Sequence, residues 1–443
     1  MAARVSRLIE AARKPVPEGT YAVGAGLVIA GLSAYAFQIL SFRELSTTRY
    51  NALNGLWVIV FVVTPGFFQP LEQEVARAVS HRRAQGIGGA PLVKRAAILG
   101  LALAIAVSIA SLAAGTFIVD QLFHGYAGLL VGLIVAIFGY YIAFITRGTL
   151  AGNARFGPYG VMQGAEGISR VLLCVGLVIL AVETPGWYGL ALAIPPFIAV
   201  AASLRGQHNL LVPGPEAPYS ELSNALGWLL AGSVLAQTLS YAPFLGVTLL
   251  STGAEKDLVG KFIAGFFVAR IPILLFQAVQ AALLPKLASH AGAGRHDDFR
   301  AGLRRLIVVV SAVGVIGIVA GFTIAPWAGR VLFGQKFILG RRDLGLLAIG
   351  TAAFILALTI AQGLIALRAY AEAAAAWLVG IAVFVLVVAE GSDLFLRVEV
   401  ASAIGALAAA GVMFVFVTLR LRSGTKPDVE DLVEVVEHEP LEI

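Results

Sequence analysis

Long apolar runs separated by short polar segments dominate the chain. Twelve of these runs are long enough to cross the ~30 Å hydrocarbon core of a bilayer, which takes roughly 20 residues as a helix. None of them alternates apolar and polar positions as a barrel strand does, so each predicts a transmembrane helix. The twelve windows are residues 19–40, 52–72, 96–119, 125–146, 159–181, 186–203, 222–250, 258–284, 304–327, 344–367, 372–390 and 397–420.

The clearest interruption in this pattern is a linker at residues 205–221, which contains Pro213, Gly214, Pro215 and Pro218. It predicts an all-α integral membrane protein with about 12 transmembrane helices in two six-helix lobes around a central cavity. The expected division is an N-terminal cytoplasmic segment (1–18), an N-lobe (19–204), the linker (205–221), a C-lobe (222–421) and an acidic tail (422–443).

A faint internal repeat supports two lobes. The residues from Arg77 to His81, at the end of the second window, match those from Lys286 to His290, at the end of the eighth, 209 residues later. Both segments enter a loop on the same side of the membrane, so the repeats would be parallel, as in some transporters.

Composition excludes several function classes. The chain is 59% hydrophobic and only 13% charged, whereas soluble proteins are about 25% charged. Its formal net charge of +6 is spread over short loops, so no nucleic-acid surface is expected. One cysteine and six histidines without ligand-like spacing predict no metal site and no disulfide. No loop is long enough for a catalytic domain, so we expect a transporter without a cofactor rather than an enzyme.

The loop charges predict the topology. Most of the 32 lysines and arginines lie in the loops that are cytoplasmic when the N-terminus is cytoplasmic. This distribution follows the positive-inside rule, and an even number of spans then places the C-terminus on the same side. We therefore expect a multi-pass protein of the bacterial inner membrane with both termini in the cytoplasm.

Polar residues inside the windows mark the candidate binding site, because a charge at mid-bilayer costs about 3 kcal/mol on insertion scales. Arg270 lies near the middle of the eighth window with no acid within a turn, so it needs a distant partner, a watery cavity or an anionic ligand. Structural hydrogen bonding between helices is the alternative for the others. The candidate cavity residues are Arg270, Arg170, Glu166, Gln163, Gln237, Gln277 and Gln280.

The stretch GFFQPLEQEVARAVSHRRAQG (66–86) places charges where the second window ends. A helix leaving the membrane explains them energetically, and Glu74 with Arg77 makes an i, i+3 pair. The matching cation in the repeat also suggests a cytoplasmic gate. The candidate gate or entrance residues are Glu72, Glu74, Arg77 and Lys286.

Four stretches resemble polysaccharide (O-antigen-type) flippases of the multidrug/oligosaccharidyl-lipid/polysaccharide flippase superfamily. They are the stretch at 66–86, VMQGAEGISR (161–170), FQAVQAALLPKLASHAGAGRHDDF (276–299) and LFGQKFILGRRDLGLLAIG (332–350). The resemblance implies a MATE-like transporter fold whose two lobes form a V-shaped cavity open to one side at a time. By the same resemblance Arg270, and then Arg170, would hold a pyrophosphate.

Three functions remain open. The first is a flippase for a polyprenyl-pyrophosphate-linked oligosaccharide, used in cell-surface polysaccharide biosynthesis. The protein would work as a monomer among membrane lipids, with a polysaccharide polymerase or glycosyltransferases as possible partners. The second is a cation-coupled multidrug exporter of the same superfamily. The third is a non-transporting scaffold that recruits cell-envelope enzymes through its loops and its acidic tail.

Overall fold

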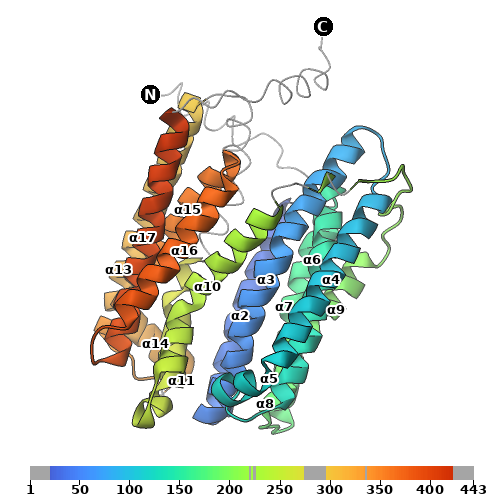
Figure 1. The fold of residues 1–443 in the computed structure, drawn as a ribbon. Coiled ribbons are helices and arrows are strands. Elements are labelled where there is room, and N and C mark those ends of the chain that lie inside the picture. The colour runs from blue at the N-terminus through green and yellow to red at the C-terminus, as the bar shows by residue number, and fades with distance from the viewer. Residues whose placement is uncertain (1–19, 219–220, 223–225, 274–295, 335–336, 423–443) are drawn as a thin grey trace, which may run out of the picture. The chain divides into compact units, whose positions relative to one another are not determined.

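The computed structural model describes residues 20–218, 221–222, 226–273, 296–334 and 337–422 (Figure 1). Helices form all of the regular structure in these ranges. Contacts between Cα atoms divide the chain into two compact units. Unit 1 is Met1–Ser41, Leu71–Gly115 and Gly128–Asn224; unit 2 is Phe42–Pro70, Thr116–Ala127 and Ala225–Ile443.

Unit 1 is built from α2 up to Ser41, α3 from Leu71 onward, α4, and α6 to α9; the short α5 lies on the boundary, with Gly115 alone in unit 1. Their bounds are α2 (Thr20–Glu44), α3 (Thr47–Ala84), α4 (Ala90–Ala113), α5 (Gly115–Phe117), α6 (Gly128–Gly152), α7 (Phe156–Ile179), α8 (Pro185–Ala193) and α9 (Pro195–Leu204). Helices α6, α7 and α9 pack on one another around a buried cluster of Ala143, Leu150, Met162 and Ala199.

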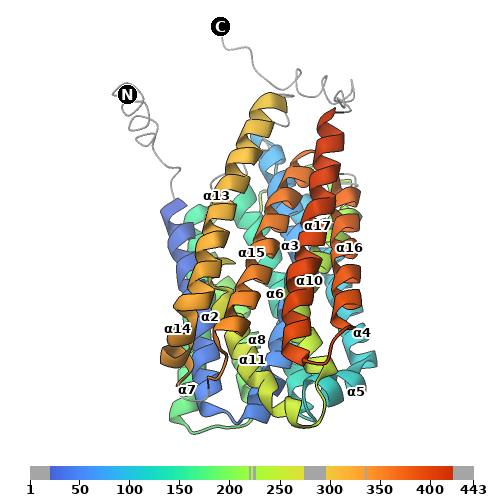
Figure 2. The ribbon, with the colours of Figure 1, turned by 90° about the vertical axis from the view of Figure 1, so that its left-hand side faces the viewer.

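Unit 2 contains the first half of α3, the π-helical turn η1 (Ile118–Leu122) and the C-terminal helices. These are α10 (Leu226–Leu250), η3 (Gly253–Glu255), α11 (Lys256–Ala269), α13 (His296–Thr323), α14 (Ala325–Phe333), α15 (Arg341–Ala366), α16 (Tyr370–Val388) and α17 (Leu394–Arg422). Within this unit α15 packs against both α13 and α17, and α16 packs against α10 and α17 (Figure 2).

The division between the units runs through a helix. Helix α3 is continuous from Thr47 to Ala84 and contains Pro65 and Pro70, and the boundary falls directly after Pro70. Phe42–Pro70 and Thr116–Ala127 therefore group with the C-terminal half of the chain, whereas the expected N-lobe included both. The boundary expected at residues 205–221 stays a prediction.

Hydropathy located the membrane spans well. Eleven helices among the described residues are long and apolar enough to cross a membrane. Eleven of the twelve expected windows coincide with them, and the sixth is broken at Ile194, between α8 and α9. The eighth window matches α11, which ends at Ala269 after 14 residues. Its second half lies in residues 274–295, outside the described ranges.

Apolar side chains on the outer faces of the helices fit a lipid environment. On α4 the exposed side chains Ile98, Leu101, Ile105, Ile109 and Leu112 recur at three- or four-residue intervals, which places them along one side. Such a stripe in water would be an association surface, whereas lipid tails solvate it. The protein is therefore a multi-pass membrane protein by its helix lengths and by its surface.

A close helix contact in unit 1 depends on glycine. A Cβ atom on Gly26 of α2 would lie 2.3 Å from the carbonyl oxygen of Gly160 on α7. A Cβ atom on Gly160 would in turn lie 2.2 Å from the carbonyl oxygen of Ala22. By contrast, a Cβ atom on Gly24 would meet nothing within 4 Å. Small residues allow backbones to approach in this way in membranes.

The substitution Gly26→Leu tests this contact. Because the backbone of α7 blocks the new side chain, we expect the unfolding free energy to fall by about 1–3 kcal/mol, the usual cost of overpacking. Thermal unfolding of the purified protein in detergent measures the effect. Gly24→Leu is the matched control on the same helix and should leave stability nearly unchanged. Equal effects of the two substitutions would contradict the close-packing account.

Candidate functional site

A buried ion pair on α7 anchors the first polar cluster of unit 1. The Arg170 guanidinium donates to Glu166 Oε1 at 2.5 Å, and the two residues are one helical turn apart. Tyr140 on α6 donates its hydroxyl to the same Glu166 oxygen at 3.0 Å. Its oxygen also accepts a hydrogen bond from Arg170 at 3.1 Å. The i, i+4 spacing of Glu166 and Arg170 on one helix places the two side chains next to each other.

A second cluster in unit 1 surrounds Arg147, near the end of α6. Its side chain donates to Gln163 Oε1 at 3.1 Å and lies 3.7 Å from Glu72 Oε2. Tyr159 donates its hydroxyl to the other Glu72 oxygen at 3.0 Å. The guanidinium carbon lies 4.0 Å from the centre of the Phe144 ring. Arg147 is thus buried, although its position just after the fourth expected window (125–146) predicts a residue of a cytoplasmic loop.

The two clusters of unit 1 balance their charges. Glu72 and Glu166 face Arg147 and Arg170, so two acids meet two bases. Buried ions are tolerated when they are paired in this way, because each then replaces lost hydration with a partner. Gln163, Glu166 and Arg170 are each less than a tenth exposed. Their expected role in a substrate cavity stays a prediction, and the structure shows them as part of the interior of unit 1.

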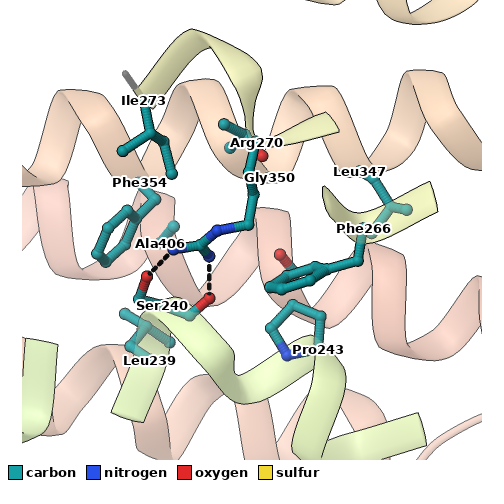
Figure 3. Close-up of a pocket in the computed structure, with 12 residues that line it drawn as sticks. Leu239, Ser240, Pro243, Phe266, Arg270, Ile273, Leu347, Gly350, Phe354 and Ala406 are labelled. Carbon is teal, nitrogen blue, oxygen red and sulfur yellow. Dashed lines mark hydrogen bonds between the residues drawn. The ribbon is translucent and has the colours of Figure 1, made fainter. Parts of the chain in front are cut away.

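Arg270 occupies a different setting, in unit 2 (Figure 3). Its guanidinium donates to the Ser240 carbonyl oxygen at 2.5 Å and to the Ser240 hydroxyl at 2.7 Å. The same group lies over the rings of Tyr241 and Phe266, at 4.6 and 4.8 Å from their centres. These contacts hold the guanidinium in a fixed position.

A small pocket with a cavity volume of about 20 Å³ adjoins this cation. Four parts of unit 2 line it: α10, the end of α11 with the residues after it, α15 and α17. Polar lining comes from Ser240, Arg270, Thr351 and Ser402, and aromatic lining comes from Phe266 and Phe354 (Figure 3). The lining combines one cation, hydroxyl groups and aromatic rings, which is the chemistry of a site for a polar, anionic group, although the cavity as seen here is only large enough for about one water molecule.

The backbone breaks at Arg270, which the sequence analysis did not predict. Helix α11 ends at Ala269, and Arg270 forms its C-cap. Pro272 follows two residues later, a usual signal for the end of a helix, because proline lacks the donor that would continue it. The eighth window was expected to be one continuous span. Broken helices occur in membrane proteins where the free backbone groups line a cavity.

The structure does not bring Gln237, another candidate cavity residue, to this pocket. Gln237 is half-buried on α10 and is not among the residues that line the pocket. Gln277, Gln280 and the gate candidate Lys286 lie outside the described residues. The internal repeat between Arg77–His81 and Lys286–His290 therefore stays a prediction.

The gate candidates on α3 differ in their surroundings. Arg77 donates to Glu74 Oε2 at 2.8 Å, which is the expected i, i+3 pair. It also donates to the Glu221 carbonyl oxygen at 2.8 Å. Glu72 points to Arg147 and Tyr159 instead, as described above. The gate role of these residues stays a prediction, but the structure joins Arg77 to the linker.

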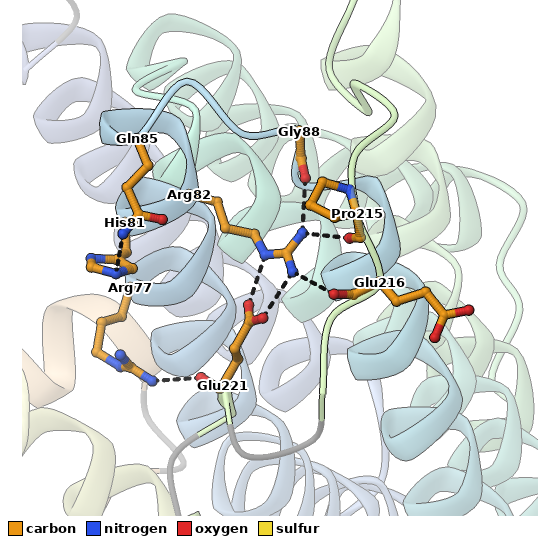
Figure 4. A network of polar contacts seen from close by, with 8 residues as sticks. All are labelled: Arg77, His81, Arg82, Gln85, Gly88, Pro215, Glu216 and Glu221. Carbon is orange, nitrogen blue, oxygen red and sulfur yellow. Dashed lines mark hydrogen bonds and ion pairs between the residues drawn. The ribbon is translucent and has the colours of Figure 1, made fainter.

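Arg82, one turn further along α3, is the centre of this junction (Figure 4). Only 4% of the residue is exposed. It donates to both Glu221 carboxylate oxygens at 2.7 and 2.8 Å, and to the carbonyl oxygens of Gly88, Pro215 and Glu216 at 3.0 to 3.2 Å. This role could not be predicted from the sequence. Apart from Gly88, the residues that Arg82 contacts lie more than 130 residues away in the chain.

Backbone contacts extend the junction along the linker. The Ala90 amide donates to the Val212 carbonyl oxygen at 3.0 Å, and Asn153 donates its side-chain amide to the Leu210 carbonyl oxygen at 3.3 Å. Gly88 and Gly214 approach so closely that a Cβ atom on either would overlap the backbone of the other segment. The linker is thus docked on unit 1 and does not run free.

Comparison with known proteins gives a fold and distant relatives. No family model matches the chain. Two mycobacterial proteins described as uncharacterized, Mb3654 of Mycobacterium bovis and Rv3630 of Mycobacterium tuberculosis, are each 26% identical to it over 325 residues. The aligned part is 71% of this chain and 72% of each relative. These relatives carry no functional assignment that could be compared.

Solved structures are more informative. A multidrug resistance MATE transporter of the MOP superfamily matches in its outward-facing form with a TM-score of 0.67 and in its inward-facing form with 0.68. These alignments cover 92% and 90% of this chain and 96% of the transporter, at 14% identity. A variant of the Vibrio cholerae MATE transporter VcmN matches with a TM-score of 0.67 over 91% of this chain and 96% of that one, at 13% identity.

The fold is that of a MATE transporter. This confirms the all-α, MATE-like fold that the sequence predicted. The matched structures themselves are described as those of transporters. Neither the MATE fold nor the distant relatives distinguish a polysaccharide flippase from a multidrug exporter.

The buried pair of unit 1 can be tested by a double-mutant cycle. Arg170→Met should lower the unfolding free energy by about 3–5 kcal/mol, because it leaves Glu166 buried without its cation. Adding Glu166→Gln to Arg170→Met should recover part of that loss, since no charge then remains unpaired. Thermal or denaturant unfolding in detergent measures both variants. Strictly additive losses would show that the two side chains do not interact.

The linker junction should depend on pH through Glu221. Its hydrogen bonds from Arg82 hold the pKa of the carboxyl below its ordinary value of 4.5. A lowered pKa means that the interaction stabilises docking above pH 4.5 and is lost as the pH falls through the still lower pKa of the docked state. Glu221→Gln should therefore speed hydrogen exchange in residues 206–218 by roughly tenfold at neutral pH.

Mass spectrometry of hydrogen exchange in the purified protein measures this difference. The difference between wild type and Glu221→Gln should vanish in acid, where both side chains are neutral. Glu216→Gln is the matched control: its side chain is 97% exposed, and its contact with Arg82 is made by the backbone. Unchanged exchange in Glu221→Gln at neutral pH would contradict the docking role.

Proposed function

We propose that this protein exports a polyprenyl-pyrophosphate-linked oligosaccharide across the bacterial inner membrane by alternating access, for cell-surface polysaccharide biosynthesis. The observation that carries the proposal is the Arg270 pocket of unit 2. A fixed cation beside hydroxyl groups, inside an apolar helical protein, matches the charge and hydrogen-bonding needs of a pyrophosphate. The MATE fold supplies the transporter architecture around it.

The chemistry of the pocket favours an anion. Guanidinium groups bind phosphate oxygens through charge-assisted hydrogen bonds, which are stronger than neutral ones. Ser240 and the two aromatic rings set the position of Arg270, so little side-chain entropy would be lost when an anion binds. The hydroxyls of Thr351 and Ser402 on the opposite helices could complete the coordination.

The size of the pocket limits what it would hold. Its cavity volume of about 20 Å³ is room for about one water molecule. Binding of a pyrophosphate would therefore require α10, α15 and α17 to move apart during transport, and the first sugar would need still more room. The polyprenyl chain would stay in the lipid, where the exposed apolar helix faces already lie. Further sugars would occupy space outside this pocket.

A cation-coupled multidrug exporter is the second candidate. The matched transporter is named for multidrug resistance, and the Phe266 and Phe354 rings are suited to flat aromatic drugs. The fixed positive charge of Arg270 disfavours the cationic drugs among them, because like charges repel strongly where the dielectric constant is low. This charge is our reason for placing the flippase first.

The orientation belongs to the same proposal. The Lys- and Arg-rich ends of the spans, including Arg82, Arg83, Lys94 and Arg95, would face the cytoplasm under the positive-inside rule. The docked linker would then lie on the cytoplasmic side, together with both termini. Transport would run from that side to the outside.

Substitution of Arg270 tests the proposed function. Undecaprenyl pyrophosphate should quench the tryptophan fluorescence of the purified wild-type protein, and Arg270→Ala should weaken this binding by roughly 10- to 100-fold. That range corresponds to the loss of charge-assisted hydrogen bonds worth about 1.5–3 kcal/mol. Arg270→Lys should retain part of the affinity, because it keeps the charge but not the planar fork.

Arg305→Ala, on the exposed face of α13, is the matched control and should bind like wild type. Ethidium, a flat cationic drug, serves as the competing probe in the same assay. Tight binding of ethidium, together with pyrophosphate binding that is equal in wild type and Arg270→Ala, would overturn the flippase proposal in favour of the multidrug alternative.

A further inference from the structure

A buried acid of unit 2 plays no part in the site described above. Glu399 lies in the second turn of α17 and is 0% exposed. Both of its carboxylate oxygens are buried, and neither has a hydrogen-bond partner among the described residues. An ionised carboxylate in such a place would lose its hydration and gain nothing in return. To be stable at this place, the carboxyl group of Glu399 therefore needs a bound ligand that neutralises its charge.

The charged neighbours of Glu399 are already engaged. On α15, Asp343 accepts a hydrogen bond from the Gly340 amide at 3.1 Å and another from Arg342 at 3.0 Å. Before α17, Asp393 accepts from the Phe395 and Leu396 amides, both at 3.1 Å. Both aspartates are thus fixed at helix N-termini, where negative charge is favourable.

Arg342 is shared between the two aspartates. It lies 3.0 Å from Asp343 and 3.5 Å from Asp393. Asp343, Asp393 and Arg342 are the groups that act electrostatically on Glu399 from the elements packed against it. Arg397 is two residues away on the same helix and so projects from a different side. An ionised Glu399 would add a third negative charge to two aspartates and one shared arginine.

We propose that Glu399 is a proton-binding site of unit 2 and that its carboxyl group is protonated in the conformation seen here. A proton removes the charge with no change in shape, and it needs no further ligand. A metal ion would need several converging ligands. No group of three His, Cys, Asp or Glu side chains that could hold one occurs in the ranges that the structure describes.

The position of Glu399 connects this site with the Arg270 pocket. Ser402 and Ala406, which line the pocket, follow Glu399 at i+3 and i+7 on α17, and therefore on one face of the helix. On α15, Leu347 and Gly350 stand in the same relation to Asp343, at i+4 and i+7. A rise of 1.5 Å per residue places Glu399 only about 5 Å along the axis from Ser402.

Because Glu399 lies next to the Arg270 pocket, its protonation would affect transport. This step rests on the proposed function. The neutral acid is stable in the packed interface of α15 and α17. Loss of the proton creates a charge that water must reach, which favours a conformation in which this interface opens. Protonation and release at Glu399 would thereby bias the two helices that line the Arg270 pocket.

Infrared spectroscopy of the full-length protein in lipid tests the protonation directly. The spectrum of wild type at neutral pH should contain a carbonyl stretching band of a protonated carboxylic acid that is missing in Glu399→Gln. Glu390→Gln, an exposed acid just before α17, is the matched control and should keep the band. Identical spectra of wild type and Glu399→Gln would overturn the proposal.

Two further measurements keep the test decisive. If Glu399→Gln does not accumulate, Glu399→Asp is the substitute, because it keeps a carboxyl group but moves it. The acid band of Glu399→Asp should shift in frequency relative to wild type. An unshifted band would overturn the assignment. Added sodium ions should leave the wild-type band unchanged, and loss of the band with sodium would assign the site to a metal cation instead. Neither measurement requires transport, so failure of the Arg270 experiment would leave this proposal standing.

Discussion

The cost of placing charge in an apolar interior governs where the polar side chains of this protein lie. The membrane offers no water to a buried ion, so each one must find a partner, a fixed dipole or a proton. Glu166 and Arg170 pair within one helix turn. Arg270 rests on a backbone carbonyl oxygen, a hydroxyl and two rings. Glu399, as we propose, carries a proton.

The two units meet this constraint in different ways. In unit 1, opposite charges on α3, α6 and α7 cancel within a short distance, which gives a rigid and electrically neutral interior. In unit 2, the cation is the C-cap of α11 and the buried acid lies in the second turn of α17, so the two occupy separate places. This separation of charges is the basis of our two proposals for unit 2, an anion at Arg270 and a proton at Glu399.

Much of the fold could be predicted from the sequence, because a membrane span is defined by length and hydropathy alone. The Glu166–Arg170 pair was also predictable, since its spacing is local.

The roles of Arg147 and Arg82 were not predictable, because their partners come from distant segments and their position near helix ends resembled that of loop cations. The break at Arg270 had a signal in Pro272 that hydropathy averaging hides. Glu399 lies near the start of the twelfth window (397–420), a position that is typical of residues at the membrane surface.

The membership of α3 in both units has a consequence for synthesis in the cell. Its first half carries Asn51, Asn54 and Thr64, which are buried within unit 2 in the finished protein. The helices that complete unit 2 begin at Leu226, more than 140 residues later in the chain. At about 5–20 residues per second, translation of that stretch takes on the order of ten seconds. During this interval the amide and hydroxyl groups of α3 lack their final surroundings, so the nascent chain depends on the insertion machinery or on temporary helix contacts to shield them from lipid.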